Sequence, residues 1–191
     1  ARCMKYIKWL VAILLLLPVS VFALYKPIRV LIPEAFGTTC HEHNVCVEDT
    51  TQLDTAVALL NNAKHDLETR WRLSMGEPKI VSCSTEKCRL AFGLSQRAGL
   101  TLGNFGILIA PRGWKSHYVA HELIHYWQAE NFGLLAGLVG EQWLIEGMAY
   151  SLSNDPREKL HEPFESYRQK FNEWYRLNPG VPLKKSVGEV L

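Results

Sequence analysis

The fold of this chain is organised around the stretch Ser116-His-Tyr-Val-Ala-His-Glu-Leu-Ile-His-Tyr-Trp127, which contains the pattern His-Glu-x-x-His. Helix-forming and apolar residues surround the pattern and predict a helix from Ser116 to about Glu130. Residues four apart lie on one face of a helix, so His121 and His125 can direct their imidazoles at a single ion. Glu122 would then lie beside that ion as a general base. The stretch therefore predicts a helix with two metal ligands and one base.

A catalytic zinc site has three protein ligands and one open position, so a third ligand must lie elsewhere in the chain. The third histidine of the metzincin pattern is excluded, because Gln128 and Asn131 stand where that pattern has glycine and histidine. The inverted pattern His-x-x-Glu-His is absent. Glu146 lies among apolar residues of a second predicted helix, where a carboxylate needs a partner. A Zn²⁺ ion held by His121, His125 and Glu146 supplies that partner.

Two segments, HELIHYWQ and WLIEGMAY, carry a family resemblance. They resemble the gluzincin peptidases, the zinc metalloproteases of thermolysin-like and related types that combine an HExxH motif with a ligand glutamate. The resemblance covers residues 100–155 and implies His121, His125 and Glu146 as Zn²⁺ ligands and Glu122 as the general base. It also implies an α+β, zincin-like fold, in which a small mixed β-sheet packs on the motif helix and further helices follow.

The chain departs from the gluzincin pattern after Glu146. The family usually has an acidic residue three or four positions later, which orients a ligand histidine, but this chain has Ala149 and Tyr150 there. Hydrolysis also requires a donor that stabilises the oxyanion besides the metal. The candidate donors, each of which can also be an ordinary surface or packing residue, are His117, Tyr118, Tyr150 and His161. His117 is the first to test, because it lies four residues before His121 on the same helix face.

The spacing of the cysteines indicates an oxidising compartment. The five cysteines are Cys3, Cys40, Cys46, Cys83 and Cys88. Four of them form two close pairs around polar loops, which predicts the local disulfides Cys40–Cys46 and Cys83–Cys88. The competing interpretation is a structural zinc site, since His41 and His43 lie beside Cys40, but the spacings do not match a CxxC pattern. Cys3 is left over on the far side of an apolar segment.

The N-terminal region predicts a secretory signal or a single-pass membrane anchor. Basic residues precede an uncharged, largely apolar run of 17 residues from Trp9 to Tyr25. A signal would be cut near Ala23, whereas an anchor would be retained in the bilayer. Both alternatives place the rest of the chain outside the cytoplasm, in the periplasm or the extracellular space. We therefore expect a signal or anchor at residues 1–25, a zincin-like domain at residues 26–180 and a loosely held tail at residues 181–191.

Hydrophobic periodicity predicts the remaining elements. The expected helices, besides that of the motif, cover residues 51–73, 141–152 and 163–176. The expected strands cover residues 28–32, 79–82, 89–92 and 105–110, and the Gly-rich residues 93–105 are expected as a polar connection. The strand at residues 105–110 is either an ordinary core strand or a sheet edge that holds an extended peptide beside the metal.

Charge and motif together favour an enzyme that acts on peptides. The chain of 191 residues has a formal net charge of +2 and no basic stripe with interleaved aromatics, so nucleic acid is not an expected partner. We expect a Zn²⁺-dependent metallopeptidase with a peptide or protein substrate outside the cytoplasm, in contact with the membrane through its N-terminal segment. The alternative is a non-catalytic zincin-like module that serves binding or structure at the membrane. Glu122 favours the enzyme, because a binding module has no need of a base between the histidines.

Overall fold

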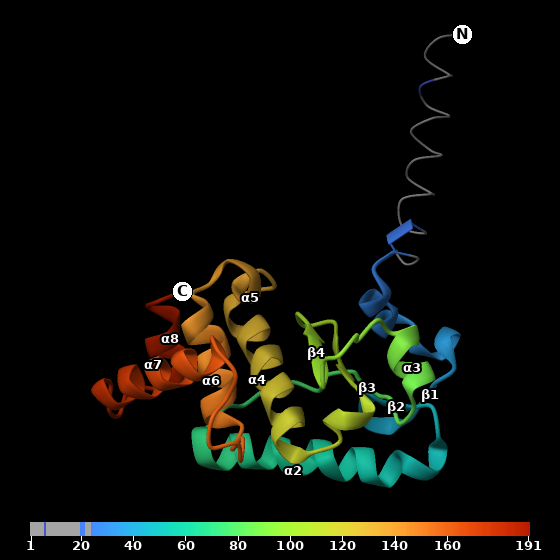
Figure 1. The fold of residues 1–191 in the computed structure, drawn as a ribbon, viewed down its shortest axis with the longest axis horizontal. Helices are drawn as coiled ribbons and strands as arrows, with labels where there is room; N and C mark the ends of the chain where they lie inside the picture. Colours follow the sequence, from blue (N-terminus) through green and yellow to red (C-terminus); the bar gives the residue numbers. More distant parts are fainter. Residues whose placement is uncertain (1–5, 7–19, 22–23) are drawn as a thin grey trace.

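The computed structural model describes residue 6, residues 20–21 and residues 24–191 (Figure 1). Most of the expected signal or anchor at residues 1–25 lies outside this part of the chain, as do Cys3 and Ala23. Among the residues that the structure describes, no helix is both long and apolar enough to span a membrane.

The chain forms an α+β fold with a five-stranded mixed sheet and several helices, which confirms the α+β class and the mixed sheet of the prediction. The strands are β1 (Thr39–Cys40), β2 (Val45–Val47), β3 (Ile80–Ser82), β4 (Gly99–Leu102) and β5 (Gly106–Ile109). Their order is β1-β2-β3-β5-β4, with β2, β3 and β5 parallel to one another. The outer strands β1 and β4 are each antiparallel to their neighbour.

Apolar side chains on the two faces of the sheet enter two separate cores. The main core includes Ile107 and Ile109 of β5 together with the buried faces of the long helices. The second core lies on the opposite face, where Leu108 packs with Val30 and Phe92. Successive residues of a strand point to opposite faces, which explains why Leu108 differs from its two neighbours. The continuous apolar run of β5 therefore belongs to a strand that is buried on both faces.

The long helices of the described chain cover the main core. They are α2 (Leu53–Trp71), α4 (Ser116–Phe132), α6 (Gln142–Leu152) and α7 (Phe164–Leu177), in agreement with the predicted helical segments. In Figure 1, α2 crosses below α4 and the sheet, while α6 lies between α4 and α7. The shorter segments are η1 (Lys26–Leu31), η2 (Pro33–Phe36), η3 (Glu42–Asn44), η4 (Thr50–Gln52), α3 (Glu86–Ala91), η5 (Pro111–Gly113), α5 (Ala136–Val139) and α8 (Leu183–Gly188).

Two predicted strands are helical in the structure, so these predictions were wrong. Residues 28–32 lie mostly in η1, whose first turn contains Pro27, and residues 89–92 lie mostly in α3. Thr85 caps α3 by accepting a hydrogen bond from the backbone N–H of Cys88. Short apolar runs are compatible with a strand or a helix, and here a proline and a capping threonine favour the helix.

The Gly-rich residues 93–105 contain a strand that periodicity did not predict. β4 pairs with β5 across a tight turn in which Gly103 has a φ of 53°. Glycine adopts this left-handed backbone at little cost, so it suits the turn. β5 consequently lies between β3 and β4, and the strand predicted at residues 105–110 is not a sheet edge. β4 is the outer strand instead, and it lies against α4.

Residues 181–191 are part of the folded structure rather than a loose tail. They contain α8, which contributes Leu183 and Val187 to the main core. These two residues are four apart and therefore share one face of the short helix. Burial of that face holds the end of the chain against the other helices.

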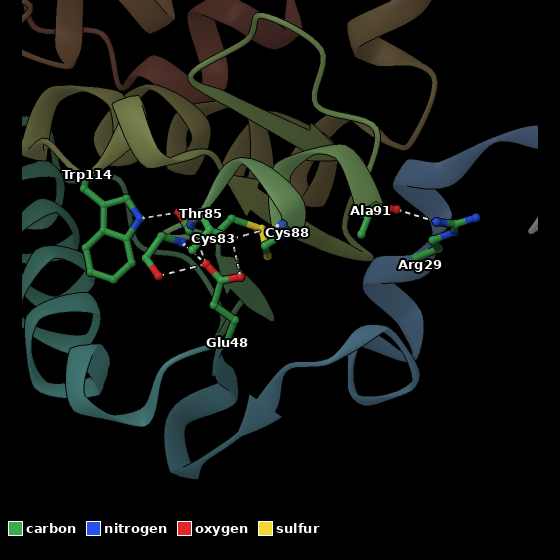
Figure 2. The surroundings of a disulfide bond; sticks show 8 residues. Arg29, Glu48, Cys83, Thr85, Cys88, Ala91 and Trp114 are labelled. Carbon is green, nitrogen blue, oxygen red and sulfur yellow. Dashed lines mark hydrogen bonds between the residues drawn. A yellow bond between two sulfur atoms is a disulfide. The ribbon is translucent and has the colours of Figure 1, made fainter.

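Both predicted disulfides, Cys40–Cys46 and Cys83–Cys88, are present. Their sulfurs are bonded to each other, so the alternative of a structural zinc site at these cysteines is excluded. Trp114, which precedes α4, donates a hydrogen bond from Nε1 to the carbonyl oxygen of Cys83 at 2.8 Å (Figure 2). The Cys83–Cys88 loop is thereby linked to the segment that leads into the motif helix.

Glu48 ties the same loop to the end of β2 (Figure 2). Its carboxylate accepts hydrogen bonds from the backbone N–H and the hydroxyl of Ser84, at 2.7 and 2.8 Å. It also accepts hydrogen bonds from the backbone N–H and the hydroxyl of Thr85. One anionic side chain therefore satisfies two backbone donors at the start of the loop.

Replacement of Glu48 by alanine is expected to lower the free energy of unfolding by about 2–4 kcal/mol, because hydrogen bonds to a charged acceptor are lost and two backbone N–H groups lose their partner. Urea denaturation under non-reducing conditions measures this change. Glu42→Ala is the matched control, since Glu42 is exposed, and its effect is expected to stay below about 0.5 kcal/mol. Equal, small effects in the two variants would contradict the role assigned to Glu48.

Candidate metal centre

Three side chains from two helices converge at one point of the structure. His121 and His125 lie on α4, and Glu146 projects from α6 toward both. The Nε2 atoms of the two histidines are 3.1 Å apart, and they lie 3.6 and 3.7 Å from carboxylate oxygens of Glu146. A tetrahedral Zn²⁺ ion with bonds of about 2.0–2.1 Å separates its ligand atoms by about 3.3 Å. The distances and the chemistry of this donor set therefore fit a zinc ion.

The packing of α6 explains why Glu146 reaches α4. The chain reverses between these two helices through α5, and α7 fixes α6 from its other side. Gly147 permits that close contact, because a Cβ atom there would lie 2.4 Å from the carbonyl oxygen of Tyr167. Leu144 and Met148 are buried in the main core. Glu146 is thereby left on the side of α6 that meets the motif helix.

The Glu146 carboxylate and the two imidazoles shift each other's pKa. Burial lowers the pKa of His125, but the close approach and negative charge of Glu146 outweigh burial and raise this pKa to about 9. Burial raises the pKa of Glu146, but the close approach of His121 and His125 outweighs it and holds this pKa far below its usual range. At neutral pH the carboxylate is therefore anionic and is paired with a protonated imidazole. A metal cation bound here would replace that proton as the counter-charge.

Gln128 orients His125 from behind. The Nδ1 atom of His125 lies 2.9 Å from Oε1 of Gln128, whose Nε2 donates to the carbonyl oxygen of Ile145 at 3.0 Å. Because the amide oxygen must accept, Nδ1 carries the proton and Nε2 is left to face the ligand set. Gln128 is buried and so bridges α4 and α6 directly behind the site. Its spacing of three residues from His125 was a sequence signal for this contact, because residues three apart share a helix face.

Replacement of Gln128 by leucine is expected to weaken zinc binding by about 10–100-fold, because the imidazole of His125 loses the acceptor that fixes its ring and tautomer. Competition with a fluorescent zinc chelator measures the dissociation constant. Gln52→Leu is the matched control. Gln52 immediately precedes α2 and does not line the cleft, so this variant should bind zinc like the wild type. Unchanged zinc affinity in a folded Gln128→Leu protein would show that this amide does not orient the ligand.

Glu122 is held by the outer strand of the sheet rather than by its own helix. Its side chain is buried, and the hydroxyl of Thr101 lies 2.7 Å from its Oε2 atom and 2.9 Å from its backbone oxygen. Gly99 lies on the same side of β4, and a Cβ atom there would lie 2.6 Å from Cγ of Glu122. The Glu122 side chain therefore fills the space that any larger residue at position 99 would occupy. The hydroxyl of Thr101 fixes the direction of the Glu122 carboxylate.

The structure separates the four candidate oxyanion donors. Tyr150 lies beside the metal ligands, with its ring centre 4.4 Å from that of His121, and Tyr118 lines the same cleft. His117 instead lines a separate cavity of about 150 Å³ at the start of the helix. His161 is exposed and does not line the cleft. Tyr150 thus contacts His121 of the candidate metal centre through its ring.

Arg157 is a cleft residue that sequence patterns did not reveal. Its guanidinium forms an ion pair with Asp155 and lies 5.7 Å from the ring centres of both Tyr118 and Tyr150. Burial raises the pKa of Asp155, but hydrogen bonds from Arg157 outweigh it and lower this pKa. Arg168 of α7 also donates a hydrogen bond to the carbonyl oxygen of Arg157 at 2.9 Å. The loop after α6 therefore holds a fixed cation next to the two tyrosines.

The site opens into a cleft of about 830 Å³. Residues of β4 line the cleft together with residues of α4, α5 and α6. The side chains of His121, Glu122, His125 and Glu146 are among the lining residues. Within the described residues β4 pairs only with β5, so its outer backbone edge remains open. A concave site of this size beside an open strand edge suits an extended chain segment.

Among known proteins, no family model, no curated protein and no solved structure matches this chain.

Proposed function

We propose that this chain is a zinc-dependent peptidase of the gluzincin type with a zincin-like fold. The observation that carries the proposal is the position of Glu122, whose buried carboxylate faces the same cleft as the three ligand side chains and is fixed by Thr101. A purely structural metal site needs its ligands but has no use for a base fixed beside them. The arrangement therefore supports hydrolysis rather than metal storage.

His121, His125 and Glu146 hold the Zn²⁺ ion in this proposal. Bound zinc supplies a Lewis acid that polarises a carbonyl group and makes water acidic. Glu122 accepts the proton of the attacking water and later returns it to the leaving amine. Thr101 keeps the carboxylate directed at the cleft during both transfers, because its hydroxyl holds one of the two carboxylate oxygens.

The substrate is an extended peptide or protein segment that lies along β4. The outer edge of this strand offers unpaired backbone donors and acceptors, which can bind a further strand. Thr101 of the same strand contacts the base, so a peptide paired with β4 would place its backbone next to Glu122. The peptide-binding edge is therefore formed by residues 99–102 and not by residues 105–110, which lie inside the sheet.

Tyr150 and Arg157 are the donors that would stabilise the oxyanion. Tyr150 is adjacent to the ligand His121, and Arg157 is held at the same side of the cleft by Asp155. A phenol or guanidinium fixed in position costs no reorganisation when negative charge develops on the substrate. This assignment moves the role away from His117, which lines a different cavity.

The two disulfides support a location outside the cytoplasm, because disulfides persist in oxidising compartments. The domain would be held at the membrane if the N-terminal segment is retained, or secreted if that segment is cleaved near Ala23. In both cases the cleft meets extracytoplasmic peptides.

Metal analysis combined with a broad peptide-library digest tests the proposal. The purified protein is expected to contain one zinc per chain, to lose cleavage on treatment with a chelator, and to regain it when zinc is added back. Bound zinc without any cleavage would leave the non-catalytic zincin-like module as the better interpretation. A wild-type protein that binds no metal would contradict both the zinc peptidase and the zinc-binding form of the non-catalytic module.

A further inference from the structure

One end of the cleft has an apolar rim. The segment between α4 and α6, residues 133–140, contains only glycine and apolar side chains. Its three leucines and Val139 are exposed, with Leu135 at 62% and Leu138 at 78%. A run of exposed leucines of this kind is unusual for a surface that faces only water.

Residues from two other parts of the chain extend this surface. Phe105 at the β4–β5 turn and Tyr25 at the start of the described domain are also exposed, and both line the cleft together with the leucines. We define the apolar rim as Tyr25, Phe105, Leu134, Leu135 and Leu138. In Figure 1, α5, the β4–β5 turn and the entry of the N-terminal chain all lie on the upper side of the domain, opposite α2.

The position of Tyr25 indicates what covers the rim. This residue ends the uncharged run of 17 residues that begins at Trp9. If it is retained as an anchor, a run of this length and composition lies in a lipid bilayer. Tyr25 is both the last residue of the run and part of the rim, so in the retained form no linker separates the anchor from the exposed leucines. Tyrosine is also a residue that favours the interface between lipid and water.

A basic side chain adjoins the rim. Lys26 directly follows Tyr25 in the chain and is exposed. Exposed basic side chains next to apolar ones bind anionic lipid head groups, while the apolar side chains enter the acyl boundary. Apolar and basic groups thus occur together, as in proteins that rest on a membrane surface.

We propose that the apolar rim is a docking surface for an anionic lipid bilayer, so that the mouth of the cleft lies at the membrane surface. Resting on the proposed function, this placement gives the peptidase a substrate class: extended segments of proteins that are themselves held close to the membrane. Peptide chains far from the bilayer would have to reach a cleft whose mouth is partly covered by lipid.

Fluorescent probes on the full-length chain test the docking directly. Leu138→Cys and, as a matched control, Leu177→Cys are made in a Cys3→Ser background and labelled with an environment-sensitive dye. Leu177 is 64% exposed at the end of α7 and does not line the cleft. In liposomes with anionic lipids, the probe at 138 is expected to shift to the blue, gain intensity several-fold and be quenched by lipid-borne doxyl groups. The probe at 177 is expected to behave as in water.

A third variant checks that the rim acts as one surface. A probe at Phe105→Cys is expected to be quenched by doxyl lipids, and to lose this quenching when Leu135→Asp and Leu138→Asp are added. Equal, water-like emission at positions 138 and 177 in liposomes would overturn the proposal. A blue shift that disappears in nanodiscs with a single protein copy would also overturn it, because a second copy would then cover the rim. The readout needs neither zinc nor cleavage, so its failure is distinct from a failure of the peptidase proposal.

Discussion

Replacement of Glu122 by glutamine is expected to lower kcat/KM for peptide cleavage by about 10²–10⁴-fold while zinc remains bound, because the general base is lost and the three ligands are kept. Glutamine has the same shape as glutamate and can still accept the hydrogen bond from Thr101, so the fold and the cleft should persist. Kinetics with a peptide selected from the library digest, together with the zinc content of the purified protein, measure both parts of the result.

Glu141→Gln is the matched control for this experiment. Glu141 precedes α6, is exposed and makes no side-chain cap on that helix, so the control should retain wild-type kinetics and zinc content. Full activity of Glu122→Gln would show that another group accepts the proton. Loss of zinc together with activity would show that Glu122 shapes the ligand set instead of acting as the base.

Replacement of Glu146 by glutamine is expected to weaken zinc binding by more than about 100-fold and to abolish zinc-dependent cleavage. Loss of a residue that only orients a metal ligand weakens metal binding by up to about 100-fold. Glu146→Gln removes an anionic ligand itself, so its effect on zinc affinity should be larger. A fluorescent chelator competition measures the affinity. Retained zinc affinity would show that the third ligand is misassigned.

The same variant has a second readout in the metal-free protein. Glu146 is the main group that raises the pKa of His125 to about 9 against the effect of burial. Without the carboxylate's charge, burial acts with less opposition, so this pKa is expected to fall well below 9. Titration of the imidazole signals by NMR follows the change. An unaltered pKa of His125 in Glu146→Gln would contradict the contact between the two helices at this point.

The features that the sequence predicted well depend on residues close together in the chain. The HExxH pattern lies within residues 121–125, and the spacing of His121 and His125 places both on one helix face without any tertiary contact. Glu146 was also recognisable, because a carboxylate amid apolar helix residues needs a partner. The cysteine pairs are equally local, since each closes a loop within a few residues.

The elements that the sequence did not predict depend on contacts between distant segments. β4 is a strand because it pairs with β5 and packs on α4, and its own residues include the weak strand former Gly99. Arg157 follows a turn after α6, and Arg168 from α7 holds its backbone carbonyl group. The role of Gln128 requires the carbonyl group of Ile145, which only the packing of α6 on α4 brings within reach.

The contact between β4 and Glu122 makes the chemistry of the helix dependent on strand register. Gly99 and Thr101 share one face of β4 because side chains alternate along a strand. A slip of β4 by one residue would present Leu100 to the carboxylate in place of Thr101, and Ala98 in place of Gly99. The buried Glu122 would then lose its hydrogen-bond donor and meet a methyl group where Gly99 now leaves space. A change in the length of the β4–β5 turn would therefore disable the base even though every residue of the HExxH helix stayed in place.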